Sequence, residues 1–305
     1  MVKKALLGNV TDNDLRLLRV FQVVAACGGF AAAELELNIN RSTISRHIKD
    51  LEVRLGATLC RRGRGGFALT VEGEQVHASA QKLMTATEDF KHEVDALKQQ
   101  LTGTLAIAIF DKTASNPRCY ISAAFSVFDE LAPEVKPEIH VEPINAIEQG
   151  VIEGRFHLGI IPTHRPSSSL EYYPLFTEQM YLYCAAGHPM FDAQKKTLTP
   201  DRVSKSRYVG IGYHSPNMEV TRQHGQQRHA TAFDQEAVAH LVLSGKYLGY
   251  LPEHYAQGFV SRGVMRALRP DVFQYVCDFS AIARRSPTPS RVTQSLLNAL
   301  VEAHS

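Results

Sequence analysis

The chain has 305 residues, 44% of them hydrophobic and 21% charged, which is typical of a globular protein with two or three domains. It has no apolar run long enough to cross a membrane and no signal peptide, so we expect a cytoplasmic protein without a membrane partner. Residues 1–70 hold 11 Lys and Arg against 6 Asp and Glu, although the whole chain has a net charge of only +2. A basic N-terminal segment on a mildly acidic body is typical of a small polyanion-binding module attached to another domain.

The N-terminal segment predicts three helices. Apolar residues recur at helical spacing over residues 14–26, where Asp12 or Asn13 is the expected N-cap. Residues 30–37 predict a second helix, and residues 41–55 predict a third one after a tight turn. This spacing is typical of a helix-turn-helix.

The third predicted helix has two different sides. Ile44, Ile48 and Leu51 form an apolar stripe, and Asn40 is the expected N-cap. The opposite side is polar and basic on its first turns, as in a helix whose N-terminal end enters the major groove of DNA. The predicted DNA-contacting residues of this helix are Arg41, Ser42, Thr43, Ser45, Arg46 and Lys49.

Gly56 ends this helix, and residues 58–70 place three arginines beside a glycine-rich turn and a short strand. Arginine stays charged and can bind phosphate with two N–H groups, so the segment predicts a β-wing along the DNA backbone. The predicted wing contacts are Arg61, Arg62 and Arg64. Helices with surface arginines also occur in proteins that do not bind DNA, but the wing and the charge distribution favour DNA binding.

A long helix follows, because residues 72–101 contain no proline and a single glycine. Apolar side chains recur in steps of four and three, which makes a seam of period 3.5 that predicts pairing with a second helix. The predicted dimerisation residues are Val76, Ala80, Leu83, Thr87, Phe90, Val94 and Leu97. A single amphipathic helix packed on its own domain is the alternative. A dimer would read two half-sites, so we expect an imperfect inverted repeat as the operator.

The remaining residues predict alternating strands and helices, and hence a parallel sheet with helices on its faces. The first predicted strand is 104–110, and Asn116-Pro117 is expected to begin a helix that ends near Leu131. The further predicted strands are 138–143, 156–161, 180–186, 208–211, 230–233, 248–251 and 273–283, and the further predicted helices are 144–153, 217–227, 235–243 and 288–303.

The N-terminal part of the sequence resembles a known family. Residues 14–73 look like the winged helix-turn-helix of LysR-type transcriptional regulators. The matching residues are Leu15, Leu18, Phe21, Gly29, Phe30, Ala33, Leu37, Ile39, Ile44, Ser45, Ile48, Leu51, Glu52, Leu55, Gly56, Leu59, Arg62, Leu69, Thr70 and Gly73. The resemblance implies that the positions of Arg41, Ser42, Ser45 and Arg46 face base edges. It also implies that the protein dimerises through the long helix and contacts RNA polymerase.

Four residues depart from the family's pattern. Glu34, Arg41, Cys60 and Glu72 stand where the family usually has alanine, glutamine, phenylalanine and alanine. Arginine pairs with guanine O6 and N7, whereas glutamine prefers adenine, so Arg41 leaves the operator sequence open.

The body resembles the LysR-type effector domain, which has the two-lobed α/β architecture of periplasmic solute-binding proteins. The matching residues are Gly103, Leu105, Ile107, Gly154, Leu158, Gly159, Ile160, Leu175, Tyr181, Leu182, Tyr183, His188, Pro189 and the segment 245–252, while His157 replaces a usual aspartate. The expected fold is α/β overall, with an all-α winged helix-turn-helix at 1–71, a linker helix at 72–102 and an effector domain at 103–305. Lobe I is expected at about 103–165 and 270–305, and lobe II at about 166–269.

Ligands of such sheets bind beyond the carboxyl ends of the strands and near helix N-termini. The candidate effector-binding residues are Lys112, Thr113, Ser115, Asn116, Thr163, His164, Arg165, Tyr213, His214, Ser215, Phe233 and Asp234. Free N–H groups at Asn116 and Asn217, with Lys112 and Arg165 nearby, suggest an anionic effector. The alternatives are that Ser115 and Asn116 only cap a helix, and that His164 and Arg165 belong to a solvated linker.

The other classes of function find less support. The sequence has no motif of a serine hydrolase, zinc protease, phosphate-binding loop or dinucleotide site, so we expect no enzyme. A binding protein without a transcriptional role would not explain residues 14–70. The five cysteines are Cys27, Cys60, Cys119, Cys184 and Cys277, an odd number without a Cys-x-x-Cys pair, so we expect no disulfide, metal or cofactor. A thiol-based redox sensor of the same architecture is the remaining alternative.

We therefore interpret the chain as a dimeric or tetrameric DNA-binding regulator of transcription. Its expected partners are a double-stranded operator, a small-molecule effector, further copies of itself and RNA polymerase. Its expected location is the bacterial cytoplasm, and the nucleoid when it is bound to DNA.

Overall fold

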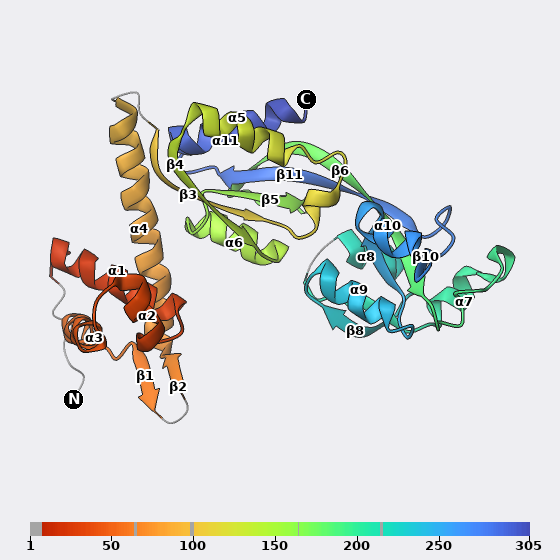
Figure 1. Cartoon of the computed structure of the whole chain (residues 1–305), viewed down its shortest axis with the longest axis horizontal. Helices are drawn as coiled ribbons and strands as arrows, with labels where there is room; N and C mark the ends of the chain where they lie inside the picture. The colour runs from red at the N-terminus through yellow and green to blue at the C-terminus, as the bar shows by residue number, and fades with distance from the viewer. Residues whose placement is uncertain (1–7, 64–65, 98–100, 164, 214–215) are drawn as a thin grey trace. The chain divides into compact units, whose positions relative to one another are not determined.

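The computed structural model describes residues 8–63, 66–97, 101–163, 165–213 and 216–305 (Figure 1). The chain divides into two compact units, Met1–Phe90 and Lys91–Ser305, which we call unit 1 and unit 2 and describe separately.

Unit 1 is a winged helix-turn-helix, as the sequence predicted. Its elements are α1 (Asp12–Ala26), α2 (Phe30–Leu37), α3 (Arg41–Leu55), the antiparallel hairpin β1 (Cys60–Gly63) and β2 (Gly66–Leu69), and the first part of α4 (Val71–Leu97). The apolar stripes of the three helices meet in one core around Phe21, Ala33 and Ile48. The N-cap of α1 is Thr11, and the predictions of Asp12 and Asn13 were wrong, because Thr11 forms a reciprocal capping box with Asp14.

A buried ion pair fixes α1 to the end of α3. The carboxylate of Asp14 accepts from Arg54 Nε at 2.8 Å and from Arg54 Nη2 at 2.6 Å, and it also accepts from the Thr11 N–H. These donors hold the pKa of Asp14 well below its usual range, with Arg54 as the largest cause. Because Asp14 is almost fully buried, the pairing sets the position of α3 within unit 1.

The long helix α4 is described as far as Leu97, and the next strand begins at Thr102. At its N-terminal end Thr70 accepts the Gly73 N–H and donates to Thr58 O. Gly73 lies so close to the backbone of Leu59 that a Cβ atom built on it would stand 1.9 Å from Leu59 O. This glycine therefore lets α4 pack against the segment that enters the wing.

Lobe I of unit 2 is a parallel sheet covered on both faces. Strand β3 (Thr102–Ile109) lies between β4 (Glu134–Val141) and β5 (Leu158–Pro162) and is parallel to both, as predicted. Helices α5 (Ile121–Leu131) and α11 (Arg291–Ala303) lie on one face, and α6 (Ile144–Glu153) lies on the other (Figure 1).

Two long antiparallel strands run from lobe I into lobe II (Figure 1). They are β6 (Leu170–Ala185) and β11 (Gln274–Arg284), and β6 is ten residues longer at its start than predicted. Pro174 lies at an irregularity of this pairing, where the register shifts opposite Phe279 and Ser280. Proline is tolerated at such a bulge but weakens the strand signal in the sequence, which explains the short prediction.

Lobe II completes the same sheet with β9 (Gly249–Pro252) and β10 (Met265–Ala267), which both pair with β6. Its other elements are the parallel strands β7 (Tyr208–Ile211) and β8 (Arg228–Ala232) and the helices α7 (Pro200–Ser204), α8 (Pro216–Gln223), α9 (Gln235–Leu243) and α10 (Glu253–Ser261). The sequence predicted neither α7, α10 nor β10. Helix α10 was missed because it begins directly after β9, with Pro252 as its N-cap and no turn residues between them.

The prediction that Asn116 begins a helix was wrong. The segment forms a single 3-10 turn, η1 (Thr113–Ser115), and α5 starts only at Ile121; a second such turn, η2 (Lys195–Thr197), lies in lobe II. The Asn116 N–H donates to Thr113 O, and the side-chain amide donates to Thr177 O at 3.1 Å. Asn116 thus connects lobe I to β6 and ends the turn η1 as its C-cap.

Two glycine-to-alanine variants test the packing of α4. Gly73→Ala should destabilise unit 1 by about 1–3 kcal/mol, because Leu59 is held by the Thr70 N–H on its oxygen and by Glu52 on its own N–H. Gly258→Ala in α10 is the matched control and should stabilise by about 0.5–1 kcal/mol, since a Cβ there meets nothing within 4 Å. Urea unfolding of the full chain measures both, and a neutral Gly73→Ala variant would contradict this packing.

Candidate functional site

Helix α3 presents the polar side that the sequence predicted, because its apolar residues Ile44, Ile48 and Leu51 are buried against α1 and α2. Thr43 and Ser45 are half-buried at the edge of this face. The exposed members of the face are Arg41, Ser42, Arg46 and Lys49. The structure therefore brings three cations and three hydroxyl groups together over the first turns of one helix.

Two side chains occupy the N-terminus of α3. Asn40 accepts from the Thr43 N–H at 2.9 Å and from the Ser42 hydroxyl at 2.7 Å, as a predicted cap should. Glu34 of α2 accepts from the Arg41 N–H. A carboxylate at this end of a helix is favourable towards the helix dipole, which gives a physical reason for glutamate at a position where alanine is usual. The Arg41 backbone N–H is consequently not available to a phosphate.

The wing is a short hairpin held on unit 1 by an aromatic contact. Phe67 of β2 packs edge-on against Phe30 of α2, with 5.9 Å between the ring centroids. Arg61 is exposed and pairs with Ala68 across the hairpin. Arg62 lies in β1, but its side chain is outside the described residues, and the predicted contact Arg64 is outside them entirely.

The predicted dimerisation seam divides into a packed part and an exposed part. Val76 packs on the core of unit 1 and Ala80 is buried, so these two stabilise their own unit. Leu83 and Val94 are exposed, and Phe90 is 65% exposed. Thr87 is half-buried and donates to Leu83 O, while the side chain of Leu97 lies outside the described residues. Exposed large apolar groups at this spacing on one helix are typical of a surface that pairs.

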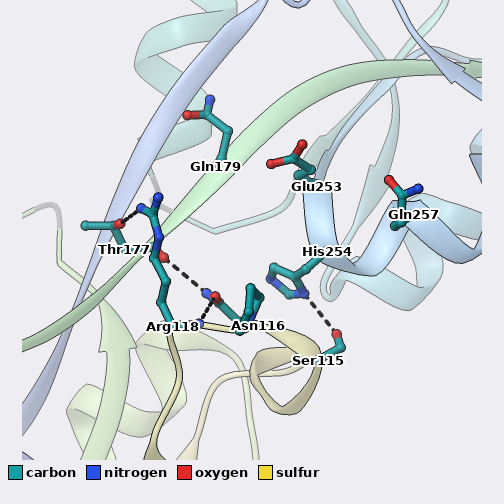
Figure 2. Close-up of a pocket in the computed structure, with 9 residues that line it drawn as sticks. Ser115, Asn116, Arg118, Thr177, Gln179, Glu253, His254 and Gln257 are labelled. Atoms are coloured by element: carbon teal, nitrogen blue, oxygen red, sulfur yellow. Dashed lines mark hydrogen bonds between the residues drawn. The ribbon is translucent and has the colours of Figure 1, made fainter.

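Unit 2 contains two cavities along the crossover strand β6. The larger one has a volume of about 460 Å³ and is shown in Figure 2. Lobe I contributes the segment 115–118, β6 contributes Thr177 and Gln179, and α10 contributes Glu253, His254 and Gln257. The predicted residues Ser115 and Asn116 thus line a cavity between the lobes.

Hydrogen bonds across this cavity connect the lobes (Figure 2). Ser115 Oγ shares a hydrogen bond of 2.9 Å with His254 Nδ1, and Arg118 Nη1 donates to Thr177 Oγ1 at 2.7 Å. His254 Nε2 also lies 2.8 Å from Glu178 Oε1, and the two side chains are only 9% and 3% exposed. Burial raises the pKa of Glu178, and the contact with His254 opposes this effect.

The smaller cavity has a volume of about 20 Å³ and is lined by Glu178, whereas its partner His254 lines the larger cavity. Its lining residues are Phe110, Ile144, Pro162, Glu178, Met180, Ile211, Tyr213, Asn217, Gln235, Tyr275 and Cys277. Asn217 is satisfied there, since it accepts from Tyr208 Oη at 2.7 Å and donates to Tyr275 Oη at 3.3 Å. Tyr213 Oη and Gln235 Oε1 have no hydrogen-bond partner among the described residues.

Asp111 lies next to this cavity and was missed by the sequence prediction, although it directly precedes the predicted Lys112. Its Oδ2 accepts from the Gln235 N–H at 2.9 Å, and its buried Oδ1 has no partner within the described part of the chain. Burial raises the pKa of Asp111 to about 6, helped by Asp234 and Glu178 and opposed by the Gln235 N–H and Lys112. A carboxylate in this environment is a candidate binding group.

The structure does not bring together the groups on which the prediction of an anionic effector was based. Lys112 is already paired with Glu236 and lies over the ring of Tyr255. Arg165 lines a separate surface pocket with Asn145, Glu148 and Gln149, away from the two cavities. Asn116 does not begin a helix, and Asn217 is the second residue of α8, with its side chain already hydrogen-bonded.

Three of the other candidate effector residues, Thr113, Thr163 and Asp234, make structural contacts. Thr113 is buried in η1, and Thr163 pairs with β11 by donating its N–H to Asp278 O and its hydroxyl to Ser280. Asp234 caps α9 by accepting the Ala237 N–H, and Phe233 is exposed. His164, His214 and Ser215 lie outside the described residues.

The cysteines of unit 2 are poor candidates for a redox sensor. Burial raises the pKa of Cys184 to about 12, and burial also raises the pKa of Cys119 and of Cys277. Cys119 precedes α5, whereas the sequence predicted that it lies within a helix. Since the thiolate is the reactive form, raised pKa values disfavour oxidation of these three side chains by peroxide.

Comparisons with known proteins agree with this geometry. Residues 15–74 match the family of bacterial regulatory helix-turn-helix proteins of the lysR type, and residues 98–305 match the LysR substrate binding domain. The chain is 40% identical over 294 residues to the HTH-type transcriptional activator BauR of Pseudomonas aeruginosa, with 96% of each protein covered. It is also 29% identical over 229 residues to LrrA, a probable HTH-type transcriptional regulator of Synechococcus elongatus, with 75% of this chain and 74% of LrrA covered.

Solved structures show the same fold. Full-length CbnR in complex with its target DNA has a TM-score of 0.63 at 18% identity, with 95% of this chain and 99% of CbnR covered. A full-length variant of OxyR from Pseudomonas aeruginosa has a TM-score of 0.61 at 20% identity, with 96% of this chain and 95% of OxyR covered.

Fold and site together define a transcription regulator that joins a winged helix-turn-helix to a two-lobed α/β domain. The chain belongs to the LysR family of bacterial transcriptional regulators. Members of this family bind DNA and small-molecule effectors and form oligomers, and they are not enzymes. In the described ranges we find no helix that is long and apolar enough to span a membrane, and no group of three potential metal ligands.

The raised pKa of Asp111 predicts that the stability of unit 2 depends on pH. Between its unfolded value near 4 and its folded value of about 6, the folded chain binds more protons, so stability falls as the pH rises through this window. The free energy of unfolding of wild-type unit 2 should fall by about 3 kcal/mol between pH 4 and pH 8 because of Asp111. The Asp111→Asn variant should not show this fall. Urea unfolding at both pH values measures the difference, with Asp129→Asn on the exposed side of α5 as control. Equal pH dependence in wild type and Asp111→Asn would contradict the burial of this charge.

Proposed function

We propose that this LysR-type regulator binds an imperfect inverted repeat as a homodimer or larger homo-oligomer, and that a small molecule bound between its lobes controls it. The observation that carries the proposal is the exposed basic face of α3 beside the wing. The proposed DNA contacts are Arg41, Ser42, Thr43, Ser45, Arg46, Lys49, Arg61, Arg62 and Arg64. Basic groups on an N-terminal helical turn suit both base edges and phosphates.

A structural relative supports binding to DNA, and the exposed part of α4 supports pairing. CbnR, which has the same fold, was solved in complex with its target DNA. The exposed apolar residues Leu83, Phe90 and Val94 lie along one helix at coiled-coil spacing. Two winged helix-turn-helix modules on one dimer would contact two half-sites related by the symmetry of the protein.

The effector would act in unit 2, where the cavities lie between lobes joined by β6 and β11. We propose that residues 1–71 bind DNA, residues 72–102 join two chains, and residues 103–305 bind the effector, with lobe I at about 103–165 and 270–305. The family matches at 15–74 and 98–305 support this division. RNA polymerase remains the predicted partner in transcription, and the cytoplasm the predicted location. BauR is a transcriptional activator, which supports activation as the direction of control.

Replacing Arg46 tests the role of α3. Arg46→Ala should weaken binding to an operator selected from random DNA by about 1–3 kcal/mol, with little loss on scrambled DNA, if the guanidinium contacts a base edge. Fluorescence anisotropy at two salt concentrations measures this. Arg19→Ala, which removes an exposed cation from α1, is the matched control. An equal loss on all sequences would assign Arg46 to the phosphate backbone, and unchanged binding would contradict the proposed face.

A charge placed on α4 tests the pairing surface. Phe90→Asp should convert the oligomer to monomers, because it buries a carboxylate in an apolar seam. Sedimentation velocity of the full chain measures the change in mass. Val71→Asp, at an exposed position in the first turn of the same helix, should leave the oligomer intact. If Phe90→Asp remains an oligomer with unchanged stability, the seam is not the interface.

A further inference from the structure

Three buried polar atoms without a partner lie in or beside the smaller cavity of unit 2: two belong to residues that line it, and the third belongs to Asp111, which is bonded to the backbone of Gln235 and acts electrostatically on Tyr213. They are Asp111 Oδ1, Gln235 Oε1 and Tyr213 Oη, each without a hydrogen bond within the described ranges. Gln235 and Tyr213 line the cavity and are only 6% and 7% exposed, and Asp111 is bonded to the backbone of Gln235. The carboxylate and amide oxygens accept hydrogen bonds, so the hydroxyl is the sole donor of the three. One O–H cannot satisfy two acceptors, and the missing group must therefore donate.

The charges near the cavity also favour a donor, and specifically a cationic one. Asp234 and Glu178 lie close enough to Asp111 to act on its carboxylate, and Lys112 is the cation that acts against them. Lys112 is itself paired with Glu236 and Glu178 has His254 as its partner, so neither Lys112 nor His254 balances Asp111 and Asp234. The N-terminus of α9 offers little to an anion, because Asp111 accepts the Gln235 N–H and Asp234 accepts the Ala237 N–H. A cationic donor completes this site, whereas a carboxylate would add to the negative charge.

The size of the cavity limits which donor group it can bind. A volume of about 20 Å³ holds roughly one water molecule, and an ammonium group is of similar size. Phe110, Ile144 and Met180 line the same cavity, so there is no room for a hydrated metal ion. A primary ammonium has three N–H donors, which can be accepted by Asp111 Oδ1, by Gln235 Oε1 and by a lone pair of Tyr213 Oη.

We propose that this cavity binds the ammonium group of a small primary amine, with Asp111, Gln235 and Tyr213 as its acceptors. The proposal rests on the proposed function, since it names the chemical class of the effector. The larger cavity shown in Figure 2 is lined by His254, the partner of Glu178, and is not part of this ammonium site.

The test is thermal unfolding of the full chain at pH 7.5 and constant ionic strength, with methylammonium chloride as the probe. Sodium acetate is the anion of matched shape, and tetramethylammonium chloride is the cation without N–H donors. Methylammonium should raise the midpoint of unit 2 by about 3–6 °C at ten times its dissociation constant, and the two controls should not. Asp111→Asn and Gln235→Leu should abolish the shift, measured within each variant. Gln235→Glu should enlarge it, and Asp129→Asn should keep it unchanged.

Three outcomes overturn the ammonium site: no shift with methylammonium, an equal shift with tetramethylammonium, or a full shift in Asp111→Asn. If acetate shifts the midpoint and Gln235→Leu abolishes that shift, the cavity still binds an effector, and only the proposed chemical class of the effector is wrong. If no compound of a metabolite library stabilises unit 2, the effector part of the proposed function fails too. DNA binding by α3 is independent of all these results, because it is measured without a ligand.

Discussion

The pairing of β6 with β11 is the constraint on which the architecture of unit 2 depends. The two strands pair from Leu170 opposite Arg284 to Tyr181 opposite Gln274, and each lobe adds its own strands to this ladder. Thr177, Glu178 and Gln179 lie where the pairing passes between the lobes. Both cavities are lined from this segment, so the binding surface is attached to the one part of the sheet that belongs to both lobes. A ligand held here contacts groups whose relative positions change if the lobes move.

Burial of charge shows how such a ligand could be coupled to the arrangement of the lobes. Glu178 is buried but has His254 as a partner, and His254 is bonded to Ser115 of lobe I. Asp111 is half-buried, its buried Oδ1 has no partner among the described residues, and its partner Gln235 belongs to lobe II. An unsatisfied buried carboxylate opposes the arrangement in which it is buried. A ligand that pairs with this carboxylate therefore binds more tightly to the arrangement that buries it and favours that arrangement. Such a difference in affinity between two states is the thermodynamic requirement for control by an effector.

The sequence predicted the bounds of those helices and strands that depend on nearby residues. The bounds of α2, α6, α9 and β7 agree with the predictions, because apolar periodicity and caps such as Asp234 and Gly154 mark them within a few residues. Elements that depend on distant partners were predicted too short or missed: β6 is stabilised by β11, and α10 follows β9 without a turn. The candidate site shows the same limit. Ser115, Asn116 and Tyr213 line cavities as expected, whereas Glu178 and His254 come from those missed or shortened elements.

The two units use carboxylates in opposite ways. In unit 1, Asp14 and Glu34 accept hydrogen bonds that fix α3, so their charges serve to place the helix. Glu34 accepts from the backbone of Arg41, whose side chain is exposed; both residues are among the four that depart from the family's usual pattern. In unit 2, one oxygen of Asp111 has no hydrogen-bond partner in the part of the chain that the structure describes. A carboxylate with all its donors in place orders the protein, whereas one that lacks a donor favours a ligand that supplies it.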